Sequence, residues 1–411
     1  MKQLLIIGHT YPEPATTAAG SRMMQLIDLF LAENFEITFA STATISERTA
    51  DLNLKNISLK NILLNDASFD DFLKELKPKT VIFDRYITEE QFGWRVSEIC
   101  PDAVKILDTE DLHFLRKARE EAVKNNIPVE NANIFSENAK REIASILRCD
   151  LSLIISEVEM HLLQNTFKIS SEILHYLPFL AENVSEKMAL PTFGERKNFM
   201  AIGNLLHAPN VDAVMQLKEI WPAIKKALPT AELHIYGTYA PQKILQLQNS
   251  KEGFYIKGWA ENVSDVMKTY RVQLAPLRFG AGLKGKFFDA MRLGLPSVTT
   301  EIGAEGMTLN SSFGGIVAEL KEDFIESAVQ LYSNENLWNS SQAMGFDIIQ
   351  KKFLKENYSE NFSVKIKWLQ KNLKLYRNQN FLGQVLQHHT LQSTKYLSKW
   401  IEEKNRAINN E

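Results

Sequence analysis

The chain has 411 residues with 47 basic and 50 acidic side chains, so its formal net charge is −3. This balance argues against non-specific binding of duplex DNA, which needs a strongly positive face, and we expect no nucleic-acid partner. Hydrophobic residues make up 45% of the chain and charged residues 24%, as in a globular protein of about two to three domains. The only cysteines, Cys100 and Cys149, exclude a disulfide scaffold and favour a reducing compartment.

No targeting or membrane-spanning pattern appears in the sequence. The apolar run at residues 4–7 is too short for the core of a signal peptide, and no run of about 20 apolar residues occurs anywhere. We therefore expect a cytoplasmic protein that could touch a membrane only from its surface.

The first half of the chain alternates short apolar runs, typical of buried strands, with amphipathic stretches, typical of helices. We predict strands at 4–7, 36–40, 80–83, 104–107, 151–156 and 173–177, and helices at 21–32, 69–76, 91–99, 112–147 with a break near Pro128, and 157–164. Continuous apolar strands that alternate with helices indicate a parallel sheet covered on both faces.

A polar stretch with Pro191 and Gly194 interrupts this pattern, and we place an interdomain linker at 186–197. The alternation then restarts, with strands at 198–202, 232–236, 254–257, 272–275 and 296–299 and helices at 211–228, 263–269 and 286–293. The predicted fold class is α/β, with two doubly wound Rossmann-like domains at 1–185 and 198–353 and C-terminal helices at 354–411.

The C-terminal tail combines basic and aromatic residues on predicted helices. The basic residues are Lys365, Lys367, Lys371, Lys374 and Arg377, and the apolar ones are Phe362, Trp368, Leu369 and Tyr376. One interpretation is a solvated helix with buried aromatic rings. The other is contact with a membrane surface or a lipid-linked acceptor, where basic and aromatic residues act together.

The strongest functional pattern follows the predicted strand that ends at Ala275. The segment 276–296 contains a glycine-rich stretch with Lys284 and Lys286, and a helix begins directly afterwards. Glycine-rich backbone, two ammonium groups and a helix N-terminus together suit a diphosphate. Asp289, one turn into the helix, can accept hydrogen bonds from a ribose diol. The spacing differs from that of a P-loop.

A second group of candidate residues lies after the first predicted strand and near the ends of other predicted strands. Gly20, at the start of a helix, would let backbone N–H groups approach an anion, and the neighbouring Arg22 is a candidate substrate contact. An ordinary loop with an N-cap is the alternative. His9 and His207 also fall near predicted strand ends that face the cleft.

His113 follows the acidic sequence 108–111 after a predicted strand, which makes it a candidate contact for a sugar or an acceptor. The alternative is that this segment caps a helix through Asp108 or Thr109. Arg116 and Arg119 lie three residues apart on the same predicted helix, where surface salt bridges are the default interpretation.

The segment 276–296 resembles the donor-binding signature of GT-B glycosyltransferases of the group 1 type, most of which retain the anomeric configuration. That family carries two glutamates separated by seven residues, the second within Glu-Ala-Met-Ala-x-Gly-x-Pro. Residues 289–296 match the second half, with Asp289 in place of that glutamate, and Ala281 stands where the first glutamate would be. Similar matches at 150–157, 199–213, 233–237, 256–259 and 299–306 extend the resemblance over most of the chain.

The resemblance implies a GT-B fold whose final helices cross back onto the N-terminal domain. It also implies a nucleotide-diphosphate sugar as donor, bound mainly by the C-terminal domain, and neither a metal nor another cofactor. The residues it assigns to catalysis are Lys286, Asp289 and Glu305. The residues assigned to substrate binding, together with those proposed above, are Gly20, Arg22, His113, Gly203, Asn204, Arg278, Lys284, Gly303 and Gly306.

The sequence thus predicts a glycosyltransferase of the hexosyltransferase type, acting in polysaccharide biosynthesis. It would move a sugar from a nucleotide sugar to a glycan, a lipid-linked acceptor or a small molecule, with retention and without metal. One alternative is a nucleotide-sugar epimerase of GT-B fold. Another, motivated by Ala281, is a donor-binding or scaffold protein that has lost catalysis. The presence of Lys284, Lys286 and Asp289 favours an enzyme, because a scaffold needs no cationic donor pocket.

Overall fold

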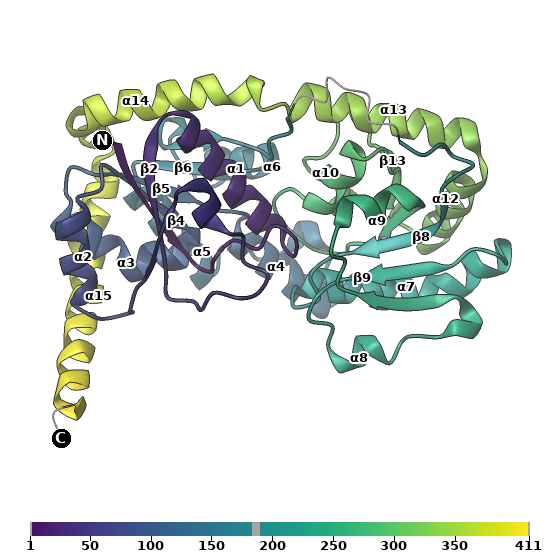
Figure 1. The fold of residues 1–411 in the computed structure, drawn as a ribbon, viewed down its shortest axis with the longest axis horizontal. Helices are drawn as coiled ribbons and strands as arrows, with labels where there is room; N and C mark the ends of the chain where they lie inside the picture. The colour runs from purple at the N-terminus through teal and green to yellow at the C-terminus, as the bar shows by residue number, and fades with distance from the viewer. Residues whose placement is uncertain (1, 183–189, 410–411) are drawn as a thin grey trace.

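The computed structural model describes residues 2–182 and 190–409 and contains two α/β domains side by side, and its last two helices lie against the N-terminal domain (Figure 1). The predicted linker at 186–197 lies partly outside the described residues. From residue 190 onward, the chain leads directly into the first strand of the second sheet.

The N-terminal domain is built on a fully parallel sheet. Its strands are β1 (Lys2–Gly8), β2 (Phe35–Ser41), β3 (Ser58–Asn61), β4 (Thr80–Asp84), β5 (Val104–Asp108), β6 (Leu151–Ile154) and β7 (Leu174–Tyr176). They are arranged in the order β3-β2-β1-β4-β5-β6-β7. Strand β1 pairs with β2 on one side and β4 on the other, so the strand order reverses beside it, where ligands bind in doubly wound sheets.

Helices cover both faces of this sheet and bury its apolar strands. They are α1 (Ala18–Ala32), α2 (Ser68–Leu76), α3 (Arg85–Ile99), α4 (His113–Lys124), α5 (Glu137–Arg148) and α6 (Glu157–Asn165). The long helix predicted at 112–147 is therefore two helices, α4 and α5, with Pro128 in the segment between them. Helix α3 begins directly after β4, six residues earlier than the predicted start at 91.

The C-terminal domain repeats the architecture with a second parallel sheet. Its strands are β8 (Lys197–Ile202), β9 (Leu233–Tyr236), β10 (Phe254–Gly258), β11 (Tyr270–Ala275), β12 (Ser297–Thr299) and β13 (Gly315–Val317), in the order β10-β9-β8-β11-β12-β13. Its helices are α7 (Ala208–Ala227), α8 (Gln242–Leu245), α9 (Val263–Thr269), α10 (Gly285–Arg292), α11 (Glu301–Ala304), α12 (Lys321–Ser333) and α13 (Glu335–Lys352). The predicted fold class, two Rossmann-like domains facing across a cleft, is confirmed.

Two further helices return to the N-terminal domain, α14 (Glu356–Gln379) and α15 (Phe381–Asn409) (Figure 1). The crossing is fixed by backbone hydrogen bonds, in which the Ala181 N–H donates to the Phe353 carbonyl and the Lys355 N–H to the Ala181 carbonyl. Farther along α14, Arg377 forms an ion pair with Asp150 at 2.7 Å. No helix among the described residues is apolar over a sufficient length to cross a lipid bilayer.

Apolar side chains also join the two domains directly. Phe179, which follows β7, packs against Phe288 of α10 with ring centroids 5.3 Å apart. Both rings belong to a buried cluster that includes Ile155 from the N-terminal domain and Met307 from the C-terminal domain. The two domains therefore share part of their core.

Arg22 of α1 is a structural residue, and its predicted contact with substrate is wrong. Its side chain is buried, its Nη2 lies 2.8 Å from Asp108 at the end of β5, and its Nη1 donates to the Leu177 carbonyl at 2.7 Å. The guanidinium thus ties α1 to the carboxyl edge of the sheet and leaves no group for a ligand.

Replacing Arg22 by methionine should lower the free energy of unfolding by about 3–5 kcal/mol, because the Asp108 carboxylate would stay buried without its partner. Urea denaturation followed by circular dichroism measures this loss. The matched control is Arg141→Met, which removes a surface pair with Glu90 and should cost less than about 1 kcal/mol. Equal losses in the two variants would contradict the structural role of Arg22.

Candidate functional site

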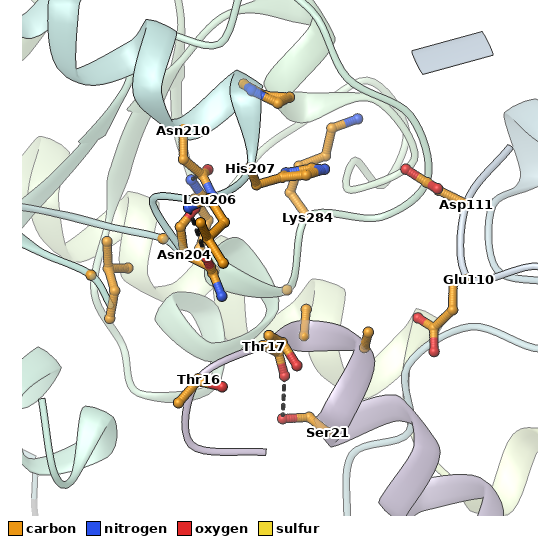
Figure 2. A pocket seen from close by; sticks show the side chains of 18 of the residues that line it. Thr16, Thr17, Ser21, Glu110, Asp111, Asn204, Leu206, His207, Asn210 and Lys284 are labelled. Atoms are coloured by element: carbon orange, nitrogen blue, oxygen red, sulfur yellow. Dashed lines mark hydrogen bonds between the residues drawn. The ribbon is translucent and has the colours of Figure 1, made fainter. Parts of the chain in front are cut away.

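The carboxyl ends of both sheets open onto a cleft of about 650 Å³ between the domains. The N-terminal wall includes His9, Thr10, Thr16, Thr17, Arg85, Glu110, Asp111, His113 and Arg116. The C-terminal wall includes Gly203, Asn204, His207, Asn210, Tyr236, Trp259, Ala281, Lys284, Lys286 and Asp289. Figure 2 shows Glu110 and Asp111 approaching from one wall and His207 and Lys284 from the other.

Several helices begin at this cleft and turn their positive ends toward it. The first residues of α1, α4 and α10 line the cleft, as do Pro209 and Asn210 in the first turn of α7. Free N–H groups and the helix dipole make such N-termini favourable for anions. No side chain among the described residues caps α10, whose first residue is Gly285. The cleft therefore offers fixed positive potential before any charged side chain is counted.

Lys284 and Lys286 add two ammonium groups at the start of α10. Lys284 donates to the Gly282 carbonyl at 3.0 Å, and Lys286 donates to the Asn210 Oδ1 at 2.7 Å. Burial, together with the neighbouring Lys284, lowers the pKa of Lys286 to about 8, and burial also lowers the pKa of Lys284. A bound anion would raise these pKa values again, because it would stabilise the charged form of each ammonium.

Asp289 lies on the same wall, three residues after Lys286, and its carboxyl lines the cleft. Burial raises the pKa of Asp289, and Arg292 lies 3.4 Å away. Gly203 and Asn204 also line the cleft, after β8, where the Asn204 carbonyl accepts from the Asn210 side chain at 2.8 Å. The fold thus brings together five of the predicted residues: Gly203, Asn204, Lys284, Lys286 and Asp289.

The opposite wall carries two more charged residues: Arg85, which sequence reasoning missed, and Glu110, which belongs to the acidic sequence 108–111 noted beside His113. They follow neighbouring strands β4 and β5, and both have left-handed backbone conformations, with φ of 70° and 63°. Neither side chain makes a hydrogen bond to any described residue, although Arg85 lies 3.6 Å from Asp84. Left-handed conformations outside glycine are uncommon and concentrate at functional sites. The sequence does not indicate these conformations, because left-handed positions are usually occupied by glycine or asparagine and not by arginine or glutamate.

His113 lines the same wall, as predicted, with its Nε2 3.3 Å from Asp111. Burial is the largest cause that lowers the pKa of His113, to about 3, so the ring is neutral. Arg116 forms an ion pair with Asp111 at 2.7 Å inside the cleft, so its interpretation as a surface salt bridge is wrong. The alternative that Asp108 or Thr109 caps α4 is also wrong, since buried carboxyls from α5 and α6 take the first N–H groups of this helix.

Some predicted contacts lie outside the residues that line the cleft. The N–H of Gly20 is taken by the Thr17 hydroxyl, so Gly20 offers no anion contact. Arg278 forms an ion pair with Asp212 on the surface. Gly303, whose N–H donates to the Thr300 hydroxyl, and Gly306 also lie away from the cleft lining.

Glu305 is one layer behind the cleft, so its predicted role as a catalytic residue needs correction. Arg119 of α4 donates to both of its oxygens, at 3.0 and 2.7 Å, and Lys284 lies 4.0 Å away. The Arg119 hydrogen bond and the two nearby cations hold the pKa of Glu305 below its usual range. Glu305 thus supports Lys284 from behind, and Arg119 is an interdomain contact rather than a surface residue.

Ala281 lines the cleft, and the next residue, Gly282, lies against the other domain. Gly282 approaches the opposite wall so closely that a Cβ atom there would lie 2.8 Å from the Asp111 Cβ. The Asp111 pKa is held low by Arg116 and His113 despite burial. Within residues 2–182 and 190–409, no group of three or more metal-ligating side chains is present.

The two facing Rossmann-like domains, with C-terminal helices crossing back, define the protein as one of GT-B fold. Solved structures of that architecture are similar over nearly the whole chain. A TarM mutant of S. aureus in complex with fondaparinux, α-GlcNAc-glycerol and UDP superposes with a TM-score of 0.68 at 11% identity, covering 89% of this chain and 99% of that one. Sucrose-phosphate synthase from Thermosynechococcus elongatus gives 0.65 at 11%, covering 90% and 99%.

WaaG, a glycosyltransferase involved in lipopolysaccharide biosynthesis, is also similar, with a TM-score of 0.59 at 13% identity and coverage of 88% and 98%. A search of curated proteins found no match. Residues 196–334, which include Lys284, Lys286 and Asp289, match the family model "Glycosyl transferases group 1". Residues 196–334 are thus similar to group 1 glycosyltransferases, and the solved structures show the GT-B fold for both domains together.

Proposed function

We propose that the protein transfers a sugar from a UDP-sugar to a hydroxyl-rich acceptor, which is a glycan, a lipid-linked saccharide or a small molecule. The observation that carries this proposal is the convergence of Lys284, Lys286 and Asp289 on the N-terminus of α10 inside the interdomain cleft. Structures similar in fold were solved with UDP, namely TarM and HepE of Anabaena, the latter also with glucose.

In the proposed reaction, the bond between the sugar C1 and the phosphate oxygen breaks. Negative charge then grows on the leaving diphosphate while positive charge grows on the sugar. Lys286, held by Asn210, and the first N–H groups of α10 would stabilise the diphosphate without reorganising. Asp289 would hold the ribose hydroxyls of the donor. The arrangement concentrates transition-state stabilisation on one wall.

The acceptor would bind on the opposite wall, near Arg85 and Glu110. Burial and the neighbouring carboxylates Asp108 and Asp84 raise the pKa of Glu110 well above its usual range. Because carboxylates crowd around Arg85, this region disfavours anionic ligands and suits hydroxyl groups, which can both donate and accept. We propose retention, in which the leaving phosphate takes the acceptor proton, on the resemblance of 276–296 to enzymes that are mostly retaining.

We also propose that α14 and α15 contact a membrane surface. Lys365 and Lys367 are engaged by Glu172 and Glu33, but Lys371 and Lys374 are exposed. Beside them in the chain are the exposed apolar residues Leu375, Phe381 and Leu382, which are 60%, 69% and 57% exposed. Basic and apolar residues in such proximity favour an anionic lipid surface.

Lys286→Ala should lower turnover by roughly tenfold to a hundredfold, because a charge-assisted hydrogen bond contributes about 1.5–3 kcal/mol and strengthens as the diphosphate leaves. Asp289→Ala should mainly weaken binding of UDP and the UDP-sugar alike. Calorimetry with UDP and steady-state kinetics on a panel of UDP-sugars measure both effects. The control is Lys226→Ala, an exposed lysine of α7. Folded variants with wild-type UDP affinity and turnover would overturn the donor site.

Activity should survive EDTA, because the cations of Lys284, Lys286 and the α10 N-terminus would neutralise the diphosphate. The measurement is UDP release from a UDP-sugar with and without EDTA, followed by back-titration with manganese or magnesium. Loss of turnover that only the metal restores would show that the diphosphate needs a divalent ion.

Membrane contact should appear as co-sedimentation with vesicles that contain anionic lipid, and it should weaken with added salt through screening. The double variant Lys371→Glu/Lys374→Glu should sediment less, whereas Lys226→Glu, on the other domain, should behave as wild type. Equal sedimentation with neutral and anionic vesicles would leave α14 and α15 with a structural role alone.

A further inference from the structure

A single buried carboxyl links the two walls of the cleft. Glu159, in the first turn of α6, has no solvent-exposed surface. Its Oε1 accepts one hydrogen bond from the Leu112 N–H at 2.9 Å and another from the Gly282 N–H at 2.8 Å. Leu112 belongs to the N-terminal domain and Gly282 to the C-terminal domain, so one oxygen atom is shared by both.

We propose that Glu159 is a positioning residue, whose carboxyl oxygen fixes the separation of the donor-binding loop from the opposite wall of the cleft. This inference rests on the proposed function, because it takes the loop around Gly282 as the donor-binding loop. Glu159 touches neither substrate in this proposal. It acts through the backbone of the two loops.

The hydrogen bonds of Glu159 continue to groups that line the cleft. The Gly282 carbonyl accepts from the Lys284 Nζ at 3.0 Å, so the residue whose N–H Glu159 holds also orients this ammonium through its carbonyl. On the other wall, Leu112 stands between Asp111 and His113 in the chain, and both of these side chains line the cleft. Movement of either peptide would therefore move charged groups on both sides of the site.

The closeness of the two walls makes this contact sensitive to geometry. Gly282 has a φ of 60°, and a Cβ atom there would lie 2.8 Å from the Asp111 Cβ. The loop thus sits against the other domain at van der Waals contact, with its N–H directed into the protein. Without Glu159, this buried N–H would have no acceptor, and an unsatisfied buried donor is unfavourable.

The surroundings of the Glu159 carboxyl favour its neutral form. Burial and the nearby carboxylates Asp111 and Glu305 raise its pKa to about 8, although the two backbone hydrogen bonds oppose this shift. Its second oxygen has no hydrogen-bond partner within the described ranges. A neutral group that works through one acceptor oxygen can be replaced by glutamine, whose amide oxygen accepts the same two bonds.

The structure provides a matched control in Glu142 of α5. Its two oxygens accept from the His113 and Phe114 N–H groups, at 3.1 and 2.9 Å, and it is as buried as Glu159. Both carboxyls therefore hold the start of α4, but Glu142 makes its bonds within the N-terminal domain only. A shortened Glu142 should loosen α4 and leave the donor-binding loop in place.

Amide hydrogen exchange of the nucleotide-free protein tests the proposal directly. Glu159→Asp, which is too short to reach both N–H groups, and Glu159→Leu, which fills the volume without an acceptor, should speed exchange in peptides covering 110–116 and 280–284. Glu159→Gln should keep wild-type protection in both. Glu142→Asp should speed exchange only in 110–116. Wild-type protection of 280–284 in folded Glu159→Asp and Glu159→Leu, or its loss in Glu142→Asp, would overturn the proposal.

Kinetics with a UDP-sugar give the functional readout. Glu159→Asp should lower kcat/KM about tenfold, the effect expected when one or two buried hydrogen bonds are lost, and Glu159→Gln should restore most of it. A uniform loss in Glu159→Asp and Glu159→Gln would contradict the positioning role. If wild-type protein fails to bind UDP in calorimetry, the proposed function fails, whereas the exchange pattern still decides whether Glu159 joins the two loops.

Discussion

The cleft depends on how the free N–H groups at the start of α4 are satisfied. Three of them, from Leu112, His113 and Phe114, have no acceptor within the helix, so the rest of the protein must supply acceptors. Two carboxyls do so, Glu142 within the domain and Glu159 with one oxygen shared by the other domain. This arrangement fixes the loop that carries the acidic residues of the N-terminal wall. It also fixes how closely the donor-binding loop can approach, so local helix capping sets the geometry of an interdomain site.

The electrostatics of the cleft favour an anion on one wall only. Burial lowers the pKa of Lys284 and Lys286 and raises that of Asp289, which means that each charged form is disfavoured until a ligand arrives. The N-termini of α7 and α10, which no side chain among the described residues caps, lie on this same wall. On the other wall, carboxylates outnumber cations around Arg85. One wall therefore favours binding of a diphosphate, and the other favours a neutral compound with hydroxyl groups. A donor and an acceptor can thus bind on separate walls without sharing a binding group.

Features that depend on residues close together in the chain could be predicted from the sequence, whereas features that depend on distant residues could not. The strands β1, β2, β4 and β5 are rich in apolar residues and were predicted within one or two residues. In contrast, β3 is short and polar, and β13 is short and follows irregular chain, so neither has a signal. The donor residues 284–289 were predicted because they are adjacent in the chain. Arg22 was assigned wrongly because its partner Asp108 is 86 residues away. Arg85 and Glu110 meet only because two strand ends lie side by side and both backbones are left-handed, and neither condition can be seen in a single sequence.

The glycine-rich run illustrates why binding and domain arrangement belong together in this fold. Sequence reasoning assigned these glycines to a diphosphate, because bare backbone lets an anion approach. The structure shows a second constraint, since a Cβ atom at Gly285 would lie 2.6 Å from the Ala18 Cβ of α1, just as one at Gly282 would meet Asp111. The same residues thus face the ligand and the other domain. Any ligand that favours one conformation of this loop must also favour the interdomain contact that goes with it, by the same free energy. The donor site is therefore a property of both domains, although nearly all of its ligand-binding groups come from one.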